Sequence, residues 1–306
     1  MRSKALALVA IGVIGAVAAG CGGSDSGTGG GSDATIEVDG SSTVAPYLTL
    51  AAEDFTGAQV TVGVSGTGGG FERFCKGETD ITNASRAIKD EEKEACATGG
   101  VEYAELQVAN DGIALVTNPG NTWAKCLTTD QLKVIWAPKS TVTTWKDVDP
   151  SFPAEEVKLF GPGTDSGTFD FFTKEINGEE GESRTDYSPS EDDNVTVQGV
   201  SGEKGGLGYF GLSYFEENKT KVAALGVDGG KGCVTPSTAT VQDGTYTPLS
   251  RPLLVYVKKA SFARPEVKDF LNYILENEVK IATEALFVPL TPTQLDGAKA
   301  ALAAIG

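Results

Sequence analysis

The chain has 306 residues, a formal net charge of −17 and no histidine. This acidity argues against nucleic acid and anionic membrane surfaces as electrostatic partners, because both carry negative charge. The absence of histidine excludes a Ser-His-Asp catalytic triad.

The first 20 residues have the composition of a secretion signal. Arg2 and Lys4 supply positive charge, residues 5–19 form an uncharged apolar run, and Cys21 follows. The run is too short for a convincing membrane-spanning helix. The small residues before Cys21 match the recognition sequence of lipoprotein signal peptidase, so we expect removal of residues 1–20 and a lipid on Cys21, with an ordinary cleaved signal as the alternative. The two acyl chains would anchor the exported protein stably to the outer face of the cell membrane.

The segment from Cys21 to residue 33 consists almost wholly of Gly, Ser and Asp after the cysteine. Such a composition predicts a flexible tether over residues 21–33. Loss of Arg2 and Lys4 with the signal takes the net charge to −19. The remaining stretch of about 270 residues exceeds the usual size of one domain, so we expect two lobes.

Four cysteines remain once Cys21 is lipidated: Cys75, Cys96, Cys126 and Cys233. An even number in an exported chain predicts two disulfides. Three pairings are possible, and we favour Cys75 with Cys96 and Cys126 with Cys233 because each pair then stays within one lobe. A metal site is the alternative, but the chain lacks close CxxC spacing and histidine.

Three segments have the pattern of a strand, a small polar loop and then a helix. The strands are expected at residues 35–39, 59–64 and 157–160, and the helices at 46–55, 71–76 and 169–176. Alternating apolar residues predict the first two strands. Three such units indicate an α/β fold with parallel or mixed sheets flanked by helices.

The C-terminal region carries clear helix signals. Pro265 opens a segment with apolar residues on one face, and residues 291–294 form a capping box with Pro at the first helical position. The apolar runs 112–116 and 253–257 predict buried strands near the points where the chain crosses between the lobes. The expected first lobe is 34–112 plus 250–306, and the expected second lobe is 113–249.

The three strand-to-helix turns, residues 40–43, 65–70 and 161–168, are rich in Ser, Thr and Gly. At a helix N-terminus the first N–H groups lack partners within the helix, and the macrodipole adds about half a positive charge. Glycine lets the backbone approach a ligand closely, and hydroxyl groups are adaptable donors. Three such ends at one point would bind a dehydrated tetrahedral anion.

Each turn alone also has a structural interpretation. The first could cap a helix, and the second could be a structural turn, since it lacks the Gly-Lys-Ser/Thr of a Walker loop. The third contains Asp165, Ser166 and Gly167, a sequence similar to that around a protease nucleophile. No lysine lies in these turns to act as the base of a Ser-Lys dyad. The sequence therefore predicts a binding protein without a cofactor, and not an enzyme.

Four motifs in chain order resemble the PstS phosphate-binding proteins. They are residues 40–44, 64–71, 77–86 and 161–169, and the resemblance continues at 192–194, 198–200, 208–211 and 248–252. The sequence is therefore identified as a member of the PstS family, the phosphate-binding component of an ABC importer. The resemblance implies a type II periplasmic-binding-protein fold, in which two lobes joined by a two-segment hinge close around inorganic phosphate.

The resemblance also implies the phosphate ligands. The expected phosphate-binding residues are Ser42, Thr43, Val44 through its N–H, Thr67, Arg86, Asp165, Ser166, Gly167 and Thr168. Arg86 departs from the best-known branch of the family, which has an acceptor Asp at this position and its phosphate-binding Arg where Pro162 stands. The planar fork of Arg86 suits two phosphate oxygens, and a structural ion pair is its alternative role.

Selectivity against sulfate requires a hydrogen-bond acceptor. At neutral pH phosphate still carries a proton, so a carboxylate in the site can accept that proton and repel fully ionised sulfate. Asp165 is the candidate acceptor and Asp80 a weaker one, while capping of the following helix is the alternative role of Asp165.

The expected function is capture of phosphate by a monomer and its delivery to an ABC permease. A phosphate sensor or a carrier of another oxyanion is the first alternative. An extracellular phosphatase is less well supported, because the chain has no histidine and no clustered metal-ligand motif.

Overall fold

The computed structural model describes residues 34–164 and 166–305. The predicted signal peptide, the lipidated Cys21 and the 21–33 tether lie outside the described residues, and so does Asp165. Within these described ranges, none of the helices is long and apolar enough to cross a membrane.

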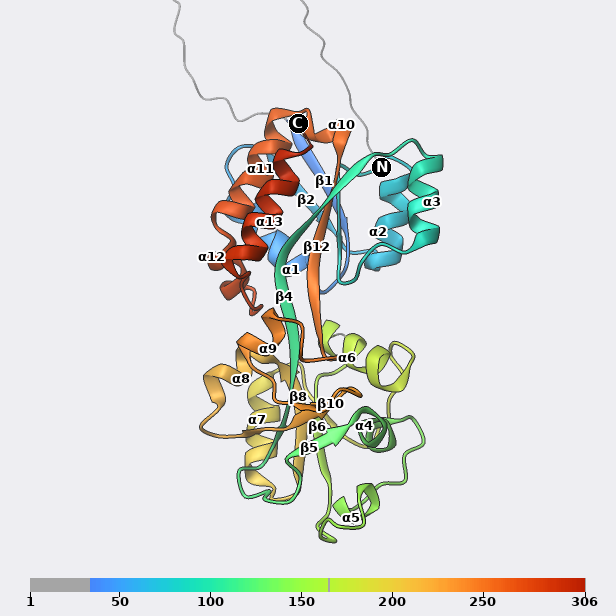
Figure 1. Cartoon of the computed structure of the whole chain (residues 1–306), viewed down its shortest axis with the longest axis vertical. Coiled ribbons are helices and arrows are strands. Elements are labelled where there is room, and N and C mark those ends of the chain that lie inside the picture. Colours follow the sequence, from blue (N-terminus) through green and yellow to red (C-terminus); the bar gives the residue numbers. More distant parts are fainter. Residues whose placement is uncertain (1–33, 165, 306) are drawn as a thin grey trace, which may run out of the picture. The chain divides into compact units, whose positions relative to one another are not determined.

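Strands and helices follow one another along the whole of this part of the chain (Figure 1). The strands are β1 (Thr35–Gly40), β2 (Gln59–Gly63), β3 (Ile81–Ala84), β4 (Tyr103–Thr117), β5 (Cys126–Thr128), β6 (Lys158–Gly161), β7 (Ser188–Pro189), β8 (Gly206–Gly211), β9 (Ala223–Ala224), β10 (Gly226–Asp228), β11 (Cys233–Val234) and β12 (Ser250–Lys258). The helices are α1 (Ala45–Asp54), α2 (Gly66–Cys75), α3 (Asp90–Thr98), α4 (Thr129–Trp136), α5 (Trp145–Val148), α6 (Gly167–Phe172), the π-helix η1 (Thr173–Asn177), α7 (Asp193–Gly202), α8 (Leu212–Asn218), α9 (Thr238–Gln242), α10 (Lys259–Phe262), α11 (Pro265–Glu276), α12 (Glu278–Glu284) and α13 (Pro292–Ala303).

The main sheet is mixed and has the strand order β2-β1-β3-β12-β4-β8-β6-β7, with β9 also paired to β4. Strands β2, β1 and β3 are parallel, as are β7, β6 and β8. Strands β12 and β4 run antiparallel to their neighbours in this order. A smaller sheet joins β11, β10 and β5. The predicted α/β class with mixed sheets and flanking helices is confirmed.

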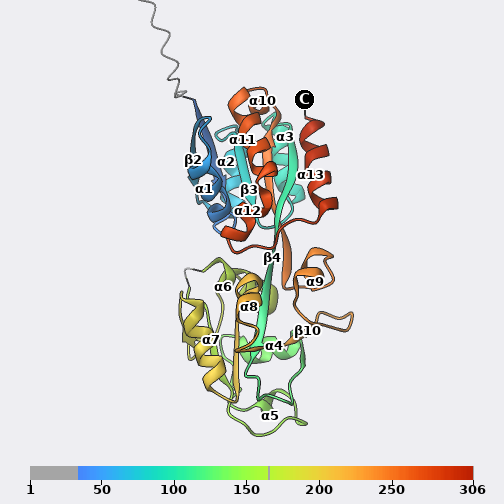
Figure 2. The ribbon, with the colours of Figure 1, turned by 90° about the vertical axis from the view of Figure 1, so that its left-hand side faces the viewer.

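Strand β4 belongs to two groups of elements. Its residues up to Gly112 pair with β12, and those from Ile113 onward pair with β8. Figures 1 and 2 show β4 running from one group into the other with β12 beside it. The first group, around β1–β3 and β12, buries a cluster that includes Val38 and Phe270, and the second group, around β6 and β8, buries a separate cluster that includes Trp136.

The first group covers both faces of its sheet with helices. Side chains alternate between the faces of a strand, so successive residues of β12 enter different cores. Val255 packs in the cluster formed with α1 and α11–α13, whereas Tyr256 packs with Phe71 and Phe74 of α2. This part of the sheet is therefore a layer between two layers of helix.

Two predicted helices have different bounds in the structure. Helix α2 begins at Gly66 instead of Phe71, so the glycine-rich turn is itself the first turn of the helix. A side chain at Gly70 would place its Cβ 2.5 Å from the Cα of Gly40, so packing against β1 requires glycine despite its low helix propensity. The third predicted helix ends as an α-helix at Phe172 and continues as the π-helix η1.

The predicted C-terminal helices are confirmed. Pro265 lies in the first turn of α11, and the Thr291 hydroxyl accepts a hydrogen bond from the Gln294 N–H as the cap of α13. The two disulfides of the structure are also the predicted ones. Cys75 at the end of α2 pairs with Cys96 of α3, and Cys126 of β5 pairs with Cys233 of β11.

Candidate functional site

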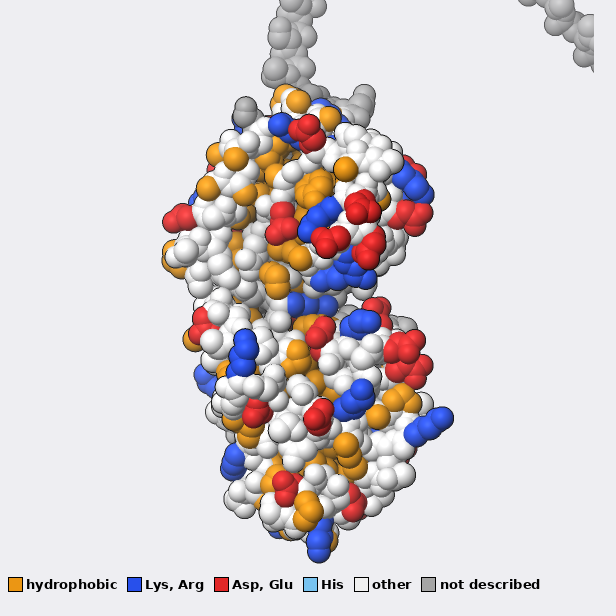
Figure 3. All heavy atoms as spheres, turned by 45° about the vertical axis from the view of Figure 1, so that its right-hand side comes forward, with side chains coloured by type: hydrophobic (Ala, Val, Ile, Leu, Met, Phe, Trp, Pro, Cys, Tyr) orange, Lys and Arg blue, Asp and Glu red, His pale blue; other side chains and the backbone are white. Residues whose placement is uncertain are grey.

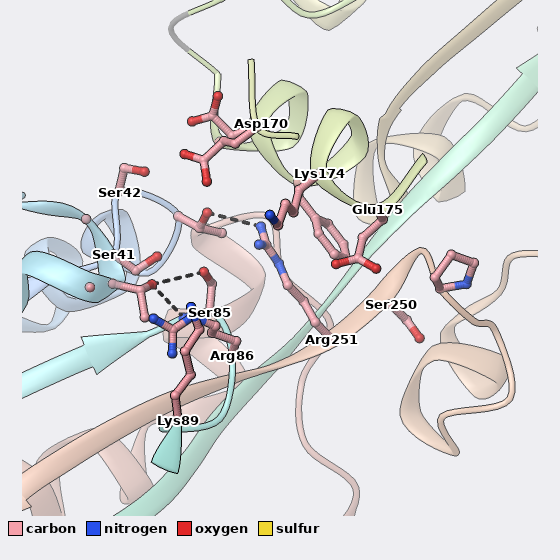
Figure 4. Close-up of a pocket in the computed structure, with 18 of the residues that line it drawn as sticks. Ser41, Ser42, Ser85, Arg86, Lys89, Asp170, Lys174, Glu175, Ser250 and Arg251 are labelled. Atoms are coloured by element: carbon pink, nitrogen blue, oxygen red, sulfur yellow. Dashed lines mark hydrogen bonds between the residues drawn. The ribbon is translucent and has the colours of Figure 1, made fainter. Parts of the chain in front are cut away.

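A cavity of about 600 Å³ lies where the two groups of elements meet (Figure 4). All three predicted turns line it, through residues 41–43 before α1, residues 66–68 in the first turn of α2, and Gly167 at the start of α6. Ser250 and Arg251 at the start of β12 also line the cavity. The structure thus brings together three turns that lie far apart in the sequence.

Only some of the predicted phosphate-binding residues line the cavity. Those that line the cavity are Ser42, Thr43, Thr67, Arg86 and Gly167. Val44, Ser166 and Thr168 are chain neighbours of these lining residues and do not line the cavity themselves. Asp165 lies outside the described residues.

The first turn is clamped by the end of β3. Ser41 donates its N–H to the Asn83 carbonyl over 3.0 Å, and the Asn83 amide donates back to the Ser41 carbonyl over 3.1 Å. Asn83 is buried, so this pair of bonds holds the turn rigidly on the sheet. The neighbouring Ser42 and Thr43 are consequently presented to the cavity.

The second turn is held by a buried carboxylate and a serine. Asp39 accepts the Ser65 N–H over 2.9 Å and forms an ion pair with Arg73. Oγ1 of Thr67 lies 3.3 Å from Oγ of Ser85 and accepts the Ser85 N–H over 3.4 Å. These contacts orient the Thr67 hydroxyl at the cavity wall.

The third turn meets the first across the cavity. Oγ of Ser166 accepts the Thr168 N–H over 3.2 Å, so this hydroxyl oxygen caps α6. A Cβ at Gly167 would lie 2.9 Å from Oγ1 of Thr43. Glycine at this position therefore permits the close approach of the two turns.

Arg86 lines the cavity but is engaged in an ion pair. Its two terminal nitrogens donate to the two carboxylate oxygens of Glu92 over 2.8 and 2.7 Å, and the side chain is 34% exposed. The hydrogen bonds that Arg86 donates to the Glu92 carboxylate raise the pKa of Arg86. In this arrangement Arg86 has the structural role that the sequence left open as its alternative.

Sequence reasoning missed Arg251 as a site residue. Its Nε donates to Asp111 over 3.0 Å and its Nη2 donates to Oγ1 of Thr43 over 3.1 Å, while its guanidinium lies 3.7 Å from the centre of the Phe171 ring. Burial lowers the pKa of Arg251, and the charge of Asp111 opposes that shift. The only sequence signal was its position in the 248–252 motif, which does not show that β12 delivers the side chain to the cavity.

The cavity lining contains more cations than carboxylates. Four cations line the cavity, namely Arg86, Lys89, Lys174 and Arg251, against the three carboxylates Asp170, Glu175 and Glu180. In the space-filling view, Lys and Arg side chains gather where the two groups of elements meet (Figure 3). Two of the four lining cations pair with carboxylates outside the lining, Arg86 with Glu92 and Arg251 with Asp111, so the N–H and hydroxyl donors at the wall, and not net charge, favour an anionic ligand.

Asp80, the weaker candidate for the acceptor, does not line the cavity. It accepts hydrogen bonds from Ser261 over 2.7 Å and from Arg264 over 3.0 Å, and these contacts tie β3 to the segment around α10. In this structure Asp80 is thus held away from the cavity in an ion pair with Arg264.

Comparison with known proteins identifies the family. The PBP superfamily domain matches residues 25–278. The chain is 48% identical over 265 residues to Protein SphX of Synechococcus elongatus, covering 84% of this chain and 78% of that protein. It is 41% identical over 276 residues to the phosphate-binding protein PstS of Staphylococcus saprophyticus, covering 88% of this chain and 85% of that protein.

A solved structure agrees with this result. The crystal structure of a possible phosphate binding protein from Planctomyces limnophilus is 44% identical to this chain and superposes with a TM-score of 0.86, covering 89% of this chain and 99% of that one. Proteins of this family are binding proteins and not enzymes, which confirms the predicted absence of catalysis. The chain therefore belongs to the PBP superfamily and, within it, to the family that includes PstS and SphX.

Proposed function

We propose that this protein is an exported substrate-binding protein that captures inorganic phosphate in the cavity and delivers it to an ABC importer. The observation that carries the proposal is the convergence of three Ser/Thr/Gly turns on one cavity that four cations also line. The name of the Staphylococcus saprophyticus relative, a phosphate-binding protein, supports phosphate as the anion.

The turns supply the donors that a tetrahedral oxyanion requires. The hydroxyl groups of Ser42, Thr43 and Thr67 would donate from the first and second turns. The third turn would add the Gly167 N–H and the Thr168 hydroxyl group, and further donors would come from Val44 N–H, the Ser166 hydroxyl group and Arg86. Because phosphate is charged, each of these bonds is of the stronger, charge-assisted kind.

The cavity would open and close by movement of two lobes, residues 34–112 plus 250–306 and residues 113–249. Their hinge would be the paired strands β4 and β12, since Gly112 pairs with Ser250 where β4 exchanges partners. A hinge of two adjacent strands allows rotation without breaking either core. Because Gly167 already lies close to Thr43 in this structure, opening would separate the third turn from the first and release the anion.

The N-terminal segment would keep the protein at the membrane. A lipid on Cys21 and the 21–33 tether would hold a monomer at the outer face of the cell membrane, within reach of the permease. This part of the proposal rests on the composition of residues 1–33.

Calorimetric titration of the full-length protein in mild detergent, stripped of bound anion, tests the proposal. We expect one-to-one binding of phosphate at neutral pH and no heat from sulfate. Absence of phosphate binding would contradict the proposal and direct the search to other oxyanions. Measurement of phosphate uptake by cells that lack the protein then separates transport from sensing. Uptake should be lost if the protein delivers phosphate to the importer, and retained if the protein only senses phosphate.

A further inference from the structure

We propose that Arg251, and not Arg86, is the principal cation that holds the anion in the cavity. This inference rests on the proposed function, because it assigns a residue to the phosphate site. Arg251 enters the site from the start of β12, outside the three turns that the sequence indicated.

The hydrogen bonds of Arg251 leave donors available for a ligand. A guanidinium group has five N–H donors. Nε of Arg251 donates to Asp111 and Nη2 donates to Thr43, whereas Nη1 meets no hydrogen-bond acceptor among residues 34–164 and 166–305. Three donors, on the two terminal nitrogens, therefore remain for an anion beside Thr43.

Arg86 has the opposite arrangement. Both of its terminal nitrogens donate to Glu92, and Nη1 also donates to the Ala87 carbonyl over 3.1 Å. Glu92 thus occupies the fork that would otherwise grip two oxygens of a phosphate. Two donors of Arg86 remain, one on Nε and one on Nη2, so it could touch an anion only from the side of its fork, whereas Arg251 keeps three donors, including both of Nη1.

Burial and packing also favour Arg251 over Arg86 as the cation that binds the anion. Its side chain is 13% exposed, against 34% for Arg86, so its charge is less screened by solvent. Asp111 from β4 and the Phe171 ring hold the guanidinium in one plane. A charged fork that is already oriented loses little conformational entropy when the anion binds.

The Thr43 hydroxyl group can form hydrogen bonds with Arg251 and with the anion at the same time. Oγ1 of Thr43 accepts from Arg251 through a lone pair and keeps its O–H free to donate. An anion in the cavity can accept this O–H together with the free N–H groups of Arg251. Because Arg251 also touches Phe171 of α6, the same cation reaches elements on both sides of the cavity.

The test compares alanine variants of full-length protein by calorimetric titration with phosphate. Truncation of a buried charged partner predicts at least about a 30-fold loss of affinity for Arg251→Ala. We expect a loss of less than about tenfold for Arg86→Ala, since a charge that is one-third exposed to solvent contributes less to binding. Arg264→Ala, which breaks an ion pair away from the cavity, is the matched control and keeps the wild-type affinity.

Two further measurements separate ligand contact from folding. The double variant Arg251→Gln with Asp111→Asn leaves no unpaired buried charge, so it should fold and still lose affinity. Guanidinium ions added to Arg251→Ala should restore part of the binding, because they fit the space beside Asp111 and Phe171, and they should not restore Arg86→Ala.

The outcomes are distinguishable. Wild-type protein that does not bind phosphate would contradict the proposed function itself. Wild-type protein that binds, together with an Arg251→Ala variant of equal affinity or an Arg86→Ala variant with the larger loss, would overturn the assignment of Arg251 and leave the proposed function standing.

Discussion

Nη2 of Arg251 donates a hydrogen bond of 3.1 Å to Oγ1 of Thr43, although 208 residues separate the two in the sequence. The bond joins the start of β12 to the turn before α1 at the cavity wall. The bond therefore holds the buried guanidinium group of Arg251 beside the Thr43 hydroxyl, which the sequence predicted to be a phosphate ligand.

The Thr43 hydroxyl should be needed for tight phosphate binding. Thr43→Val keeps the shape of the side chain but removes one donor and leaves the Arg251 N–H without its acceptor. Loss of a hydrogen bond to a charged group costs about 1.5–3 kcal/mol, so titration should show an affinity about 10- to 150-fold lower. Thr43→Ser retains the hydroxyl and is the control. A valine variant that binds like the wild type would exclude this role.

Asp170 should contribute to discrimination against sulfate. It lies in α6 and lines the cavity, and burial raises the pKa of its carboxyl group. An ionised carboxylate accepts the phosphate proton and repels sulfate, so Asp170→Asn should narrow the ratio of phosphate to sulfate affinity by about tenfold or more. Because the pKa is raised, falling pH should protonate Asp170, and so weaken discrimination by the wild type, earlier than it would protonate an ordinary Asp carboxyl group.

Competition titrations with both anions measure this ratio. Glu179→Gln, which removes an exposed carboxylate outside the cavity lining, is the control. Asp165→Asn, measured in parallel, tests the acceptor predicted from the sequence. An unchanged ratio in the Asp170 variant, with a reduced ratio in the Asp165 variant, would assign the acceptor to Asp165.

The two disulfides should stabilise the fold unequally. Cys126 and Cys233 are 107 residues apart, whereas Cys75 and Cys96 are 21 apart. A cross-link removes more entropy from the unfolded chain when the loop is longer, so serine replacement should cost about 5 kcal/mol for the first pair and about 3 kcal/mol for the second. Denaturant unfolding of the two double-serine variants checks the order, and equal losses would show that loop length does not decide it.

Glu278 should make the protein less stable as the pH rises through the acidic range. The residue is 1% exposed and accepts the Leu290 N–H over 2.8 Å, and burial raises its pKa from 4.5 to about 7. Between these values the folded state binds more protons than the unfolded state, so the free energy of unfolding falls with rising pH. The fall should be on the order of 2–3 kcal/mol between pH 5 and pH 8.

Glu278→Gln tests this assignment, because an amide can still accept the Leu290 N–H without becoming charged. Urea unfolding at pH 5 and pH 8 should show a smaller decline for the glutamine variant than for the wild type. Glu276→Gln, an exposed neighbour at the end of α11, is the control and should keep the wild-type decline. Equal declines in all three proteins would show that Glu278 titrates normally.

Local sequence patterns determined a large part of this protein. Alternation of apolar residues predicted β1 and β2, and the capping box at Thr291 predicted α13, because each depends on a few neighbouring residues. The even number of cysteines and their expected positions gave the disulfide pairing. The three Ser/Thr/Gly turns indicated one anion site, since their chemistry is visible without the fold.

Only the tertiary structure decided how charges are paired around that site. The partners of Arg251 are 140 and 208 residues away, and they meet through the register of β12 on β4 and the position of the first turn. The Arg86 pair with Glu92 depends on where α3 starts relative to β3, and the start of α2 at Gly66 depends on packing against Gly40. Such contacts follow from side-chain geometry across separate elements, which local periodicity and turn chemistry do not contain.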